Sequence, residues 1–310
     1  MSYDTIRLQI TKNNFCNQMN YIIIIRGGNI NMEKIRDLIQ VDLTKCTMCG
    51  SCSKVCPTGV IGIDENGPKV VGQFCISCGH CVAVCHCAAL DNIKTPLANQ
   101  VALEKTPVLD EDTAARFLRS RRSIREFQNK PIPREKIEKL LDMARFAPTS
   151  GNSQGISYHV IDNVDTLRKI TSVAIDWLEE ALKNPPYAGS PYEAPFSAHV
   201  THYRETGEDV VLRNAPCLVI PIVNKNASPT AHDSTLFSLA YTELYATSMG
   251  LGTCITGFFD ACAASGYKPL LDILNLPEDM KVTGGLMVGF PKYTYKRLVD
   301  RNPLKVTWGK

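Results

Sequence analysis

The chain has 310 residues, of which 44% are hydrophobic and 21% charged, which is typical of soluble globular proteins and leaves room for one large and one small domain. Its formal net charge of +3 gives no strong attraction for nucleic acid or a membrane surface, so we expect neither as a partner. The apolar run at residues 21–25 is too short for a signal-peptide core or a membrane span.

The first 31 residues show no sustained hydrophobic period. Arg26-Gly27-Gly28 is what a purine-rich ribosome-binding sequence would encode if translated, and it lies a few codons before Met32. We therefore expect residues 1–31 to be a non-native or disordered extension, with the native chain starting at Met32. The alternative is a genuine N-terminal extension, and we assign no function to it.

The 13 cysteines are distributed unevenly, since nine of them lie between Cys46 and Cys87. Clustered cysteines without a secretory signal favour metal ligands in a reducing cytoplasm over disulfide bonds. The expected localisation is therefore cytoplasmic. Outside this region lie Cys16, Cys217, Cys254 and Cys262. Of these, we expect Cys16, Cys217 and Cys262 only to pack.

Two runs of the form C-x-x-C-x-x-C-x-x-x-C begin at Cys46 and Cys75 and repeat at a constant offset of 29 residues. Three thiolates of such a run can reach three corners of one 4Fe–4S cluster, while the fourth, expected in the following helix, reaches the other cluster. The predicted ligands of the first cluster are Cys46, Cys49, Cys52 and Cys85. The predicted ligands of the second cluster are Cys75, Cys78, Cys81 and Cys56.

Between the two runs, Asn66-Gly67 predicts a hairpin turn joining residues 59–63 to residues 69–71. Residues 36–92 resemble the bacterial two-cluster ferredoxins, which implies a small ferredoxin-like domain holding two 4Fe–4S clusters. The second run departs from that pattern by having His86 where proline is usual. We expect this change to alter hydrogen bonding or solvent access near Cys85, and hence the cluster potential.

Zinc is the alternative metal, because it also binds C-x-x-C pairs. A zinc site needs four cysteines in two pairs, whereas each run here is itself a set of four, so iron–sulfur clusters are favoured. Cys87 is left over and is predicted to be a buried thiol or a neighbour of the ligands.

Residues 93–109 contain two Thr-Pro steps and weak periodicity, as expected of a linker. From residue 110 to residue 310, alternating helical and extended patterns predict an α+β domain that is large enough to bury its own core. Helices are expected over residues 114–119 (with Asp110 and Asp112 as cap candidates), from Pro133, over 165–183 and over 232–249. Strands are expected over residues 157–161, 215–223 and 281–288.

Three details of this domain are also predicted. The helix from Pro133 should bury one face, formed by Ile137, Leu140, Leu141 and Ala144. The long helix should direct four residues into the core, namely Leu236, Leu239, Ala240 and Leu244. The polar, proline-containing segment 187–213 is interpreted as a loop or cap.

The segment from Arg121 to Arg125 carries three arginines in five residues. Such a cluster suits a phosphate, which guanidinium groups bind with paired hydrogen bonds, although taken alone it favours a solvated basic patch. It is followed by Ala-Pro-Thr-Ser-Gly-Asn-Ser-Gln at 147–154, Gly-Leu-Gly-Thr-Cys-Ile-Thr-Gly at 250–257 and Arg-Asn-Pro-Leu at 301–304. In this order, the four motifs resemble the nitroreductase family over residues 113–308.

The resemblance implies an FMN-binding homodimer. It places Arg121, Ser123 and Arg301 at the FMN phosphate, with Arg122 beside the phosphate and the ribityl chain. Arg125 would lie at the pyrimidine edge of the flavin, where positive charge stabilises the reduced anion. The backbone N–H groups of Thr256 and Gly257 would approach flavin N5, so no catalytic side chain is expected. Contacts across the dimer interface would come from Pro148, Thr149, Ser150 and Asn152.

Two departures from the family leave the substrate open. The loop continues Gln154-Gly155-Ile156 where Gln-Pro-Trp is usual, and Thr256 stands where some relatives have an acidic residue. Gly250 and Gly252 have a second interpretation as a helix C-cap. No G-x-G-x-x-G motif predicts a nicotinamide site, but the family admits NAD(P)H as a transient donor. Surface or hydrogen-bonding roles are expected for His199 and His202.

The resulting hypothesis is an oxygen-sensitive flavoenzyme of an anaerobic or facultative host, in which two 4Fe–4S clusters pass electrons to FMN. The flavin would then reduce a nitroaromatic, quinone or enone. Two alternatives are carried with it. In the first, NAD(P)H reduces FMN and the clusters export electrons to a partner protein. In the second, the protein is a non-catalytic redox sensor or electron carrier. Flavin-fragmenting or dehalogenating chemistry, known on similar folds, is a further possibility.

Overall fold

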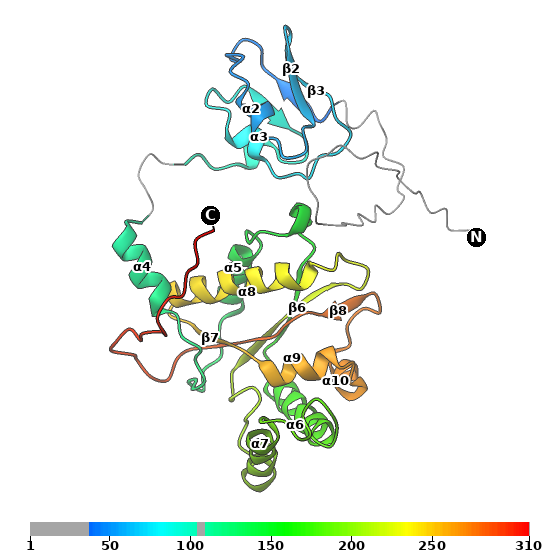
Figure 1. Ribbon diagram of the computed structural model, residues 1–310, viewed down its shortest axis with the longest axis vertical. Coiled ribbons are helices and arrows are strands. Elements are labelled where there is room, and N and C mark those ends of the chain that lie inside the picture. The colour runs from blue at the N-terminus through cyan, green and yellow to red at the C-terminus, as the bar shows by residue number, and fades with distance from the viewer. Residues whose placement is uncertain (1–36, 104–108, 310) are drawn as a thin grey trace, which may run out of the picture. The chain divides into compact units, whose positions relative to one another are not determined.

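The computed structural model describes residues 37–103 and 109–309, so the predictions for residues 1–31 and Cys16 lie outside the described residues. The described chain divides into two compact units (Figure 1). The first consists of residues 37–75 and 79–100, and the second of residues 76–78, 101–103 and 109–309.

The first unit is built from two short antiparallel pairs of strands, which follow the same 29-residue repeat as the cysteines. Strand β1 (Ile39–Val41) pairs with β4 (Leu90–Asn92), and β2 (Ile61–Asp64) pairs with β3 (Gly67–Val70). Adding 29 to the residue numbers of β1 gives 68–70, within β3, and adding 29 to those of β2 gives 90–93, which covers β4. Leu38, Val60, Ile61, Val82 and Leu90 form its small core. The internal repeat seen in the cysteines is therefore a repeat of structure.

The two cysteine runs have the same backbone. Helices α2 (Ser51–Lys54) and α3 (His80–Ala83) each follow a glycine with positive φ, Gly50 at 78° and Gly79 at 74°. Cys52 and Cys81, the third cysteines of the runs, lie inside these helices. The fourth cysteines, predicted to lie in the helix, instead follow its end, because each helix is only four residues long.

The predicted hairpin is present as β2–β3. Asp64 pairs with Gly67, so the turn residues are Glu65 and Asn66, one position earlier than the Asn-Gly pair that predicted it. Gly67 adopts φ 110°, a value that favours glycine. The 3-10 helix η1 (Leu97–Asn99) lies within the segment that we interpret as a linker.

The second unit contains an antiparallel sheet in the order β5-β6-β9-β7, with β8 paired to β6 (Figure 1). Its strands are β5 (Ser157–Ile161), β6 (Cys217–Asn224), β7 (Gly252–Ile255), β8 (Met280–Val282) and β9 (Leu286–Gly289). Strand β6 is buried almost throughout because helices cover both faces.

Alternate residues of the central strands enter two different cores. Leu218 and Ile220 pack in the larger core, whereas Cys217 and Val219 pack in the smaller one. The smaller core lies under α5 (Arg134–Ala144) and α8 (Ala231–Ser248). The helices on the larger core are α6 (Val164–Ala181), α7 (Glu193–Thr206), α9 (Gly257–Ala264) and α10 (Lys268–Leu274). This arrangement confirms the predicted α+β class.

Several predicted elements are confirmed. Helix α4 (Glu111–Ser120) begins at Asp110, whose side chain accepts a hydrogen bond from the Thr113 N–H, and α5 begins after Pro133. Strand β5 has the predicted bounds, and β6, α6 and α8 differ from the predicted ranges by one or two residues at their ends.

Three predictions are wrong in detail. The segment 187–213 is not a continuous loop, since α7 occupies its middle. The predicted strand 281–288 is two strands, β8 and β9, because Gly284 and Gly285 interrupt it. In α8, Leu239 is buried as predicted, but Leu236 and Ala240 are exposed. The buried face of α8 carries instead Ser234, Thr235, Ser238, Thr242 and Glu243.

Within residues 37–103 and 109–309, no helix combines the length and apolar character needed to cross a membrane.

Candidate functional site

The four predicted ligands of the first cluster line a single small pocket. Cys46, Cys49 and Cys52 reach it from the first run and Cys85 from the second. Apolar walls are provided by Val41, Ile63, Pro68 and Leu90. In a repeat of this kind, three cysteines of one run and the fourth cysteine of the other bind the same cluster. The residues that line the pocket therefore fit a 4Fe–4S cluster.

Hydrogen-bond donors contact two sulfur atoms of the second run, one predicted to bind each cluster. The Ala89 N–H donates to Cys85 Sγ at 3.2 Å, and the side-chain amide of Asn92 donates to Cys81 Sγ at 3.6 Å. Such donors stabilise the negative charge of an iron–sulfur cluster and influence its potential. His86 is exposed, in the turn that holds Cys85.

Zinc fits this arrangement less well. Among the described residues, no group of three or more His, Cys, Asp or Glu side chains is arranged to hold a single metal ion. A structural zinc site needs four ligands converging on one ion. The cysteines of the pocket are the set expected for one 4Fe–4S cluster, whose four iron atoms each bind a separate thiolate.

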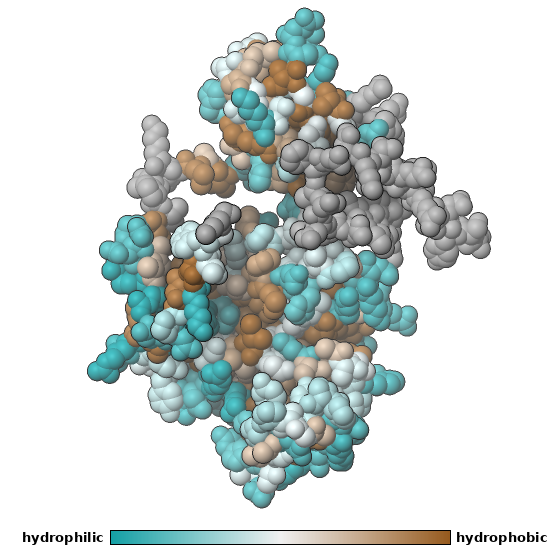
Figure 2. All heavy atoms as spheres, viewed as in Figure 1, coloured by the Kyte–Doolittle hydropathy of each residue, from teal (hydrophilic) through white to brown (hydrophobic). Residues whose placement is uncertain are grey.

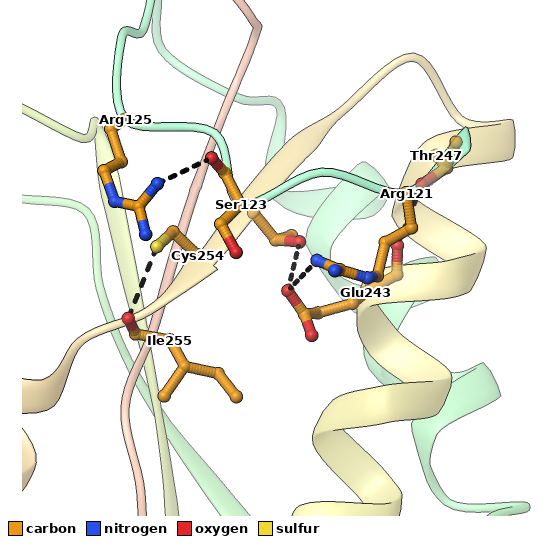
Figure 3. Close-up of polar contacts among 8 residues, drawn as sticks. Arg121, Ser123, Arg125, Glu243, Thr247, Cys254 and Ile255 are labelled. Carbon is orange, nitrogen blue, oxygen red and sulfur yellow. Dashed lines mark hydrogen bonds and ion pairs between the residues drawn. The ribbon is translucent and has the colours of Figure 1, made fainter. Parts of the chain in front are cut away.

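In the second unit, the arginine segment runs along the edge of the sheet. Ser123 bridges in parallel to Thr253 of β7, and the Ile124 N–H donates to the Thr253 carbonyl at 2.8 Å. The side chains of Arg121 and Arg125 consequently contact different neighbours (Figure 3).

Arg121 forms an ion pair with a buried carboxylate. Its Nη1 lies 3.3 Å from Oε1 of Glu243 on α8, and the Thr253 hydroxyl donates to the same oxygen at 3.3 Å (Figure 3). Burial raises the pKa of Glu243, and the Arg121 charge opposes that rise. The pair holds the Arg121 guanidinium at the C-terminal half of α8, beside the start of β7.

The two glycines before Thr253 have different roles. Gly250 has φ 69° and follows Met249, the residue that caps the C-terminus of α8. The Leu251 N–H donates to the Ala246 carbonyl there, so Gly250 belongs to the C-terminal cap of the helix. Gly252 is needed for close packing, because a Cβ there would lie 2.6 Å from Ile124 Cγ1.

Thr256 and Gly257 form the N-terminus of α9. Thr256 is 1% exposed, and its Oγ1 has no hydrogen-bond partner among the described residues. Apart from its chain neighbours and the backbone of its own helix, no described atom lies within 4 Å of a Cβ built on Gly257, so this position faces open space. The Thr256 N–H donates to the Gly285 carbonyl at 3.1 Å, so it is already engaged within the chain. The N–H groups of the first turn of α9, from Gly257 on, favour a negatively charged or hydrogen-bond-accepting group.

A cavity of about 430 Å³ opens at this helix end. Arg125, Cys254, Thr256 and Gly257 line it on one side. Its other walls are largely aromatic and apolar, and they include Tyr187, Tyr192, Phe196, Val210, Val211, Arg213 and Phe258. The volume and the few polar groups are typical of a small-ligand site, and they suit a flat conjugated ring.

The segment 187–213 provides much of this wall, as its interpretation as a cap anticipated. Phe196 packs edge-on against Phe258, with ring centroids 5.0 Å apart, and against Tyr192 at 5.5 Å. Sequence reasoning did not single out Arg213, Tyr192 or Phe196, because no local motif marks them.

Other predicted residues lie elsewhere. Arg122 donates to the Arg297 carbonyl and lies 5.2 Å from the centre of the Tyr295 ring. Arg301 is in the exposed segment 292–309, which forms no helix or strand. Eight of the eleven predicted FMN contacts do not line the cavity, namely Arg121, Arg122, Ser123, Pro148, Thr149, Ser150, Asn152 and Arg301.

The two histidines of the cap have ordinary contacts. His202 hydrogen-bonds Glu208 at 2.7 Å, and the His199 ring packs against Phe258. Burial, followed by the nearby charges of Arg213 and His202, lowers the pKa of His199. A neutral His199 is therefore expected near pH 7.

Comparison with known proteins gives two family matches. Residues 118–290 match the nitroreductase family, and residues 38–86 match a 4Fe–4S dicluster domain. A nitrobenzene nitroreductase of Ectopseudomonas oleovorans is 25% identical over 209 residues, which is 60% of this chain and 87% of that protein. An FMN reductase [NAD(P)H] of Bacillus subtilis is 23% identical over 178 residues, 56% of this chain and 64% of that protein.

Solved structures share the fold of the second unit. A Bacteroides fragilis nitroreductase with bound FMN is 19% identical, with a TM-score of 0.50, and the match covers 64% of this chain and all of that one. An iodotyrosine deiodinase bound to FMN is 20% identical, also with a TM-score of 0.50, over 63% of this chain and 98% of that one.

Proposed function

This chain belongs to the nitroreductase family, and on that premise we propose that it is an iron–sulfur flavoprotein oxidoreductase in which two 4Fe–4S clusters supply electrons to FMN and FMN reduces a small acceptor. The observation that carries the proposal is the presence, in one chain, of a pocket lined by four predicted cluster ligands and a cavity suited to a flavin. FMN, when bound, accepts electrons singly and delivers them in pairs.

Three features of the cavity support FMN as the ligand. Thr256 lines the cavity, and within residues 37–103 and 109–309 its hydroxyl has no hydrogen-bond partner. Arg125 and the N-terminus of α9 place positive charge on the same cavity, which favours the reduced, anionic ring. Arg121 and Ser123 lie on the same segment as Arg125, and their assignment to the phosphate, together with Arg301, is part of the proposal.

The proposal includes a homodimer. Leu236, Phe237 and Tyr241 form an exposed apolar strip on α8, and Figure 2 shows brown side chains on the visible face of this unit where Figure 1 draws α8. Pro148, Thr149, Ser150 and Asn152 would complete the flavin site of a partner subunit. Sedimentation of the holoprotein tests this assembly, and a monomer that retains FMN would contradict it.

Electron entry through the clusters is tested with two variants at equivalent positions of the repeat, Cys49→Ala and Cys78→Ala. In the anaerobic holoprotein, bleaching of FMN absorbance is followed after adding either reduced ferredoxin or NADH. We expect either substitution to slow bleaching by ferredoxin at least a hundredfold, because one cluster is lost, and to leave any bleaching by NADH unchanged.

Two outcomes would contradict this direction of electron flow. Ferredoxin could bleach the variants as fast as the wild type, or NADH alone could support rapid turnover while the clusters only export electrons. FMN content measured beforehand in each variant serves as the control, since neither cysteine is among the cavity residues.

The acceptor is proposed to be a flat aromatic or conjugated molecule, such as a nitroaromatic, quinone or enone, that stacks near Phe196 and Tyr192. Arg213 adds a second guanidinium group and would favour acceptors that carry a negative charge. We expect Arg213→Gln to raise the KM for 4-nitrobenzoate about tenfold, equal to about 1.4 kcal/mol, and to change that for nitrobenzene much less. Steady-state kinetics with both substrates measures the difference, and equal effects on the two would refute a charge-selective role.

A further inference from the structure

A fifth thiol shares the pocket of the first cluster. Cys87 lines it together with Cys46, Cys49, Cys52 and Cys85. The Sγ of Cys87 lies 3.8 Å from the Sγ of Cys85. A cubane offers four iron atoms to four thiolates, so this pocket contains one more candidate ligand than a cluster needs.

The internal repeat provides a direct comparison. The position equivalent to Cys87 in the first run is Thr58, whose hydroxyl lies 3.6 Å from Cys56 Sγ. The surrounding turn is the same, since the Gly59 N–H donates to the Cys56 carbonyl at 3.2 Å and the Ala88 N–H to the Cys85 carbonyl at 3.0 Å. A threonine hydroxyl there can only hydrogen-bond to the ligand sulfur. A cysteine at the same place can also bind iron.

The residue between the two thiols also differs between the runs. Pro57 follows Cys56, and its ring fixes φ, whereas the exposed His86 follows Cys85. The backbone at residue 86 is therefore less restricted than at residue 57. That freedom allows Cys87 to move towards an iron atom without disturbing α3.

We propose that Cys87 is a reserve ligand of the first cluster, which binds iron when Cys85 does not. The exchange breaks the Fe–S bond to Cys85 and forms one to Cys87. The proton of the Cys87 thiol passes through solvent to the released Cys85 thiolate, or stays in solvent where residue 85 is alanine, so no electron is gained or lost. The inference rests on the cluster assignment made under the proposed function and concerns the first cluster only, because Thr58 cannot replace Cys56.

The test compares cluster content in two matched pairs of variants purified without air. The pair at the first cluster is Cys85→Ala and the double variant Cys85→Ala/Cys87→Ala. The pair at the second is Cys56→Ala and Cys56→Ala/Thr58→Cys. Iron, sulfide and the EPR spectrum of the reduced protein are measured, and FMN content confirms in each case that the second unit is folded.

We expect Cys85→Ala to keep nearly all of the wild-type iron and sulfide, with an altered EPR signal, and the double variant to lose about half. Cys56→Ala should lose about half as well, and adding Thr58→Cys should restore part of it. Equal losses in Cys85→Ala and its double variant would overturn the inference, as would an unaltered EPR signal in Cys85→Ala. A wild-type protein without iron and sulfide would overturn the proposed function too, so the two failures are distinguishable.

Discussion

Replacing Asp260 with asparagine is expected to stabilise the protein above pH 8 and to change its stability little near pH 4. Asp260 lies in the first turn of α9, and its Oδ1 is out of solvent without a hydrogen-bond partner in the part of the chain that the structure describes. Burial raises the pKa of this carboxyl group from its usual value near 3.8 to about 8. A buried carboxylate without a partner is costly, so the folded protein keeps the proton.

The direction of the pH dependence follows from proton binding. Between pH 4 and pH 8 the folded state holds the Asp260 proton and the unfolded state has released it, so unfolding releases a proton and is favoured by rising pH. The free energy of unfolding should therefore fall across this window and level off above it. A pKa difference of one corresponds to about 1.4 kcal/mol, so a difference of about four gives a total loss on the order of 6 kcal/mol.

Asparagine is neutral at every pH and should remove this dependence. Thermal or urea unfolding of the anaerobic holoprotein, measured at pH 5, 7 and 9 for wild type and Asp260→Asn, gives the difference directly. Asp272→Asn is the matched control, because Asp272 is an exposed carboxylate on α10 that pairs with Lys268 at 2.6 Å. If the difference between Asp260→Asn and wild type stays constant from pH 5 to pH 9, the carboxyl group is already ionised in the folded state.

The small unit could be predicted closely because its constraints are local. Cluster coordination fixes the spacing of the cysteines, and the turns around them need positive φ at fixed positions such as Gly50 and Gly79. The wrong prediction that the fourth cysteine of each run lies in a helix has the same origin. Spacing indicates that Cys56 and Cys85 reach another cluster, but it does not determine where a four-residue helix ends.

The long helix α8 shows where hydrophobic periodicity fails. Its buried face carries Thr235 and Thr242, whose hydroxyls donate to backbone carbonyls one turn earlier and so need no partner in the core. Its exposed face carries Leu236 and Phe237. Apolar residues mark the face that contacts another surface, and they do not reveal whether that surface belongs to the same subunit.

The cap helix α7 was missed for a related reason. Only Val200 is buried among its residues, so no apolar stripe marks it in the sequence. Pro195 in its first turn was the available signal, since proline is tolerated there. Phe196 and Arg213 reach the cavity through tertiary packing, which no local motif encodes. The charged motif at Arg121–Arg125 was visible in the sequence. The sequence did not indicate that Arg121 pairs with Glu243 while Arg125 lines the cavity.

Replacing Gly252 with alanine is expected to destabilise the second unit by about 1–3 kcal/mol and to weaken FMN binding about tenfold. A Cβ at this position would lie 2.6 Å from Ile124 Cγ1 and 2.9 Å from Pro291 Cγ, so Ile124 must move. Ile124 is 6% exposed, and its N–H donates to the carbonyl of Thr253 at 2.8 Å. Moving it shifts Ser123 and Arg125, which flank it on the segment proposed to hold the flavin.

A double-mutant cycle separates this packing effect from a general loss of stability. Ile124→Ala alone should cost about 2–5 kcal/mol by leaving a cavity. Combined with Gly252→Ala, it removes Ile124 Cγ1, the nearest of the atoms that the new methyl group meets. The double variant should therefore be more stable than the sum of the two by about 0.5 kcal/mol or more. Gly155→Ala is the control for added volume, because a Cβ there would come no closer than 3.9 Å to another residue. Strictly additive costs, or full retention of FMN in Gly252→Ala, would mean that contact with Ile124 does not position the arginine segment.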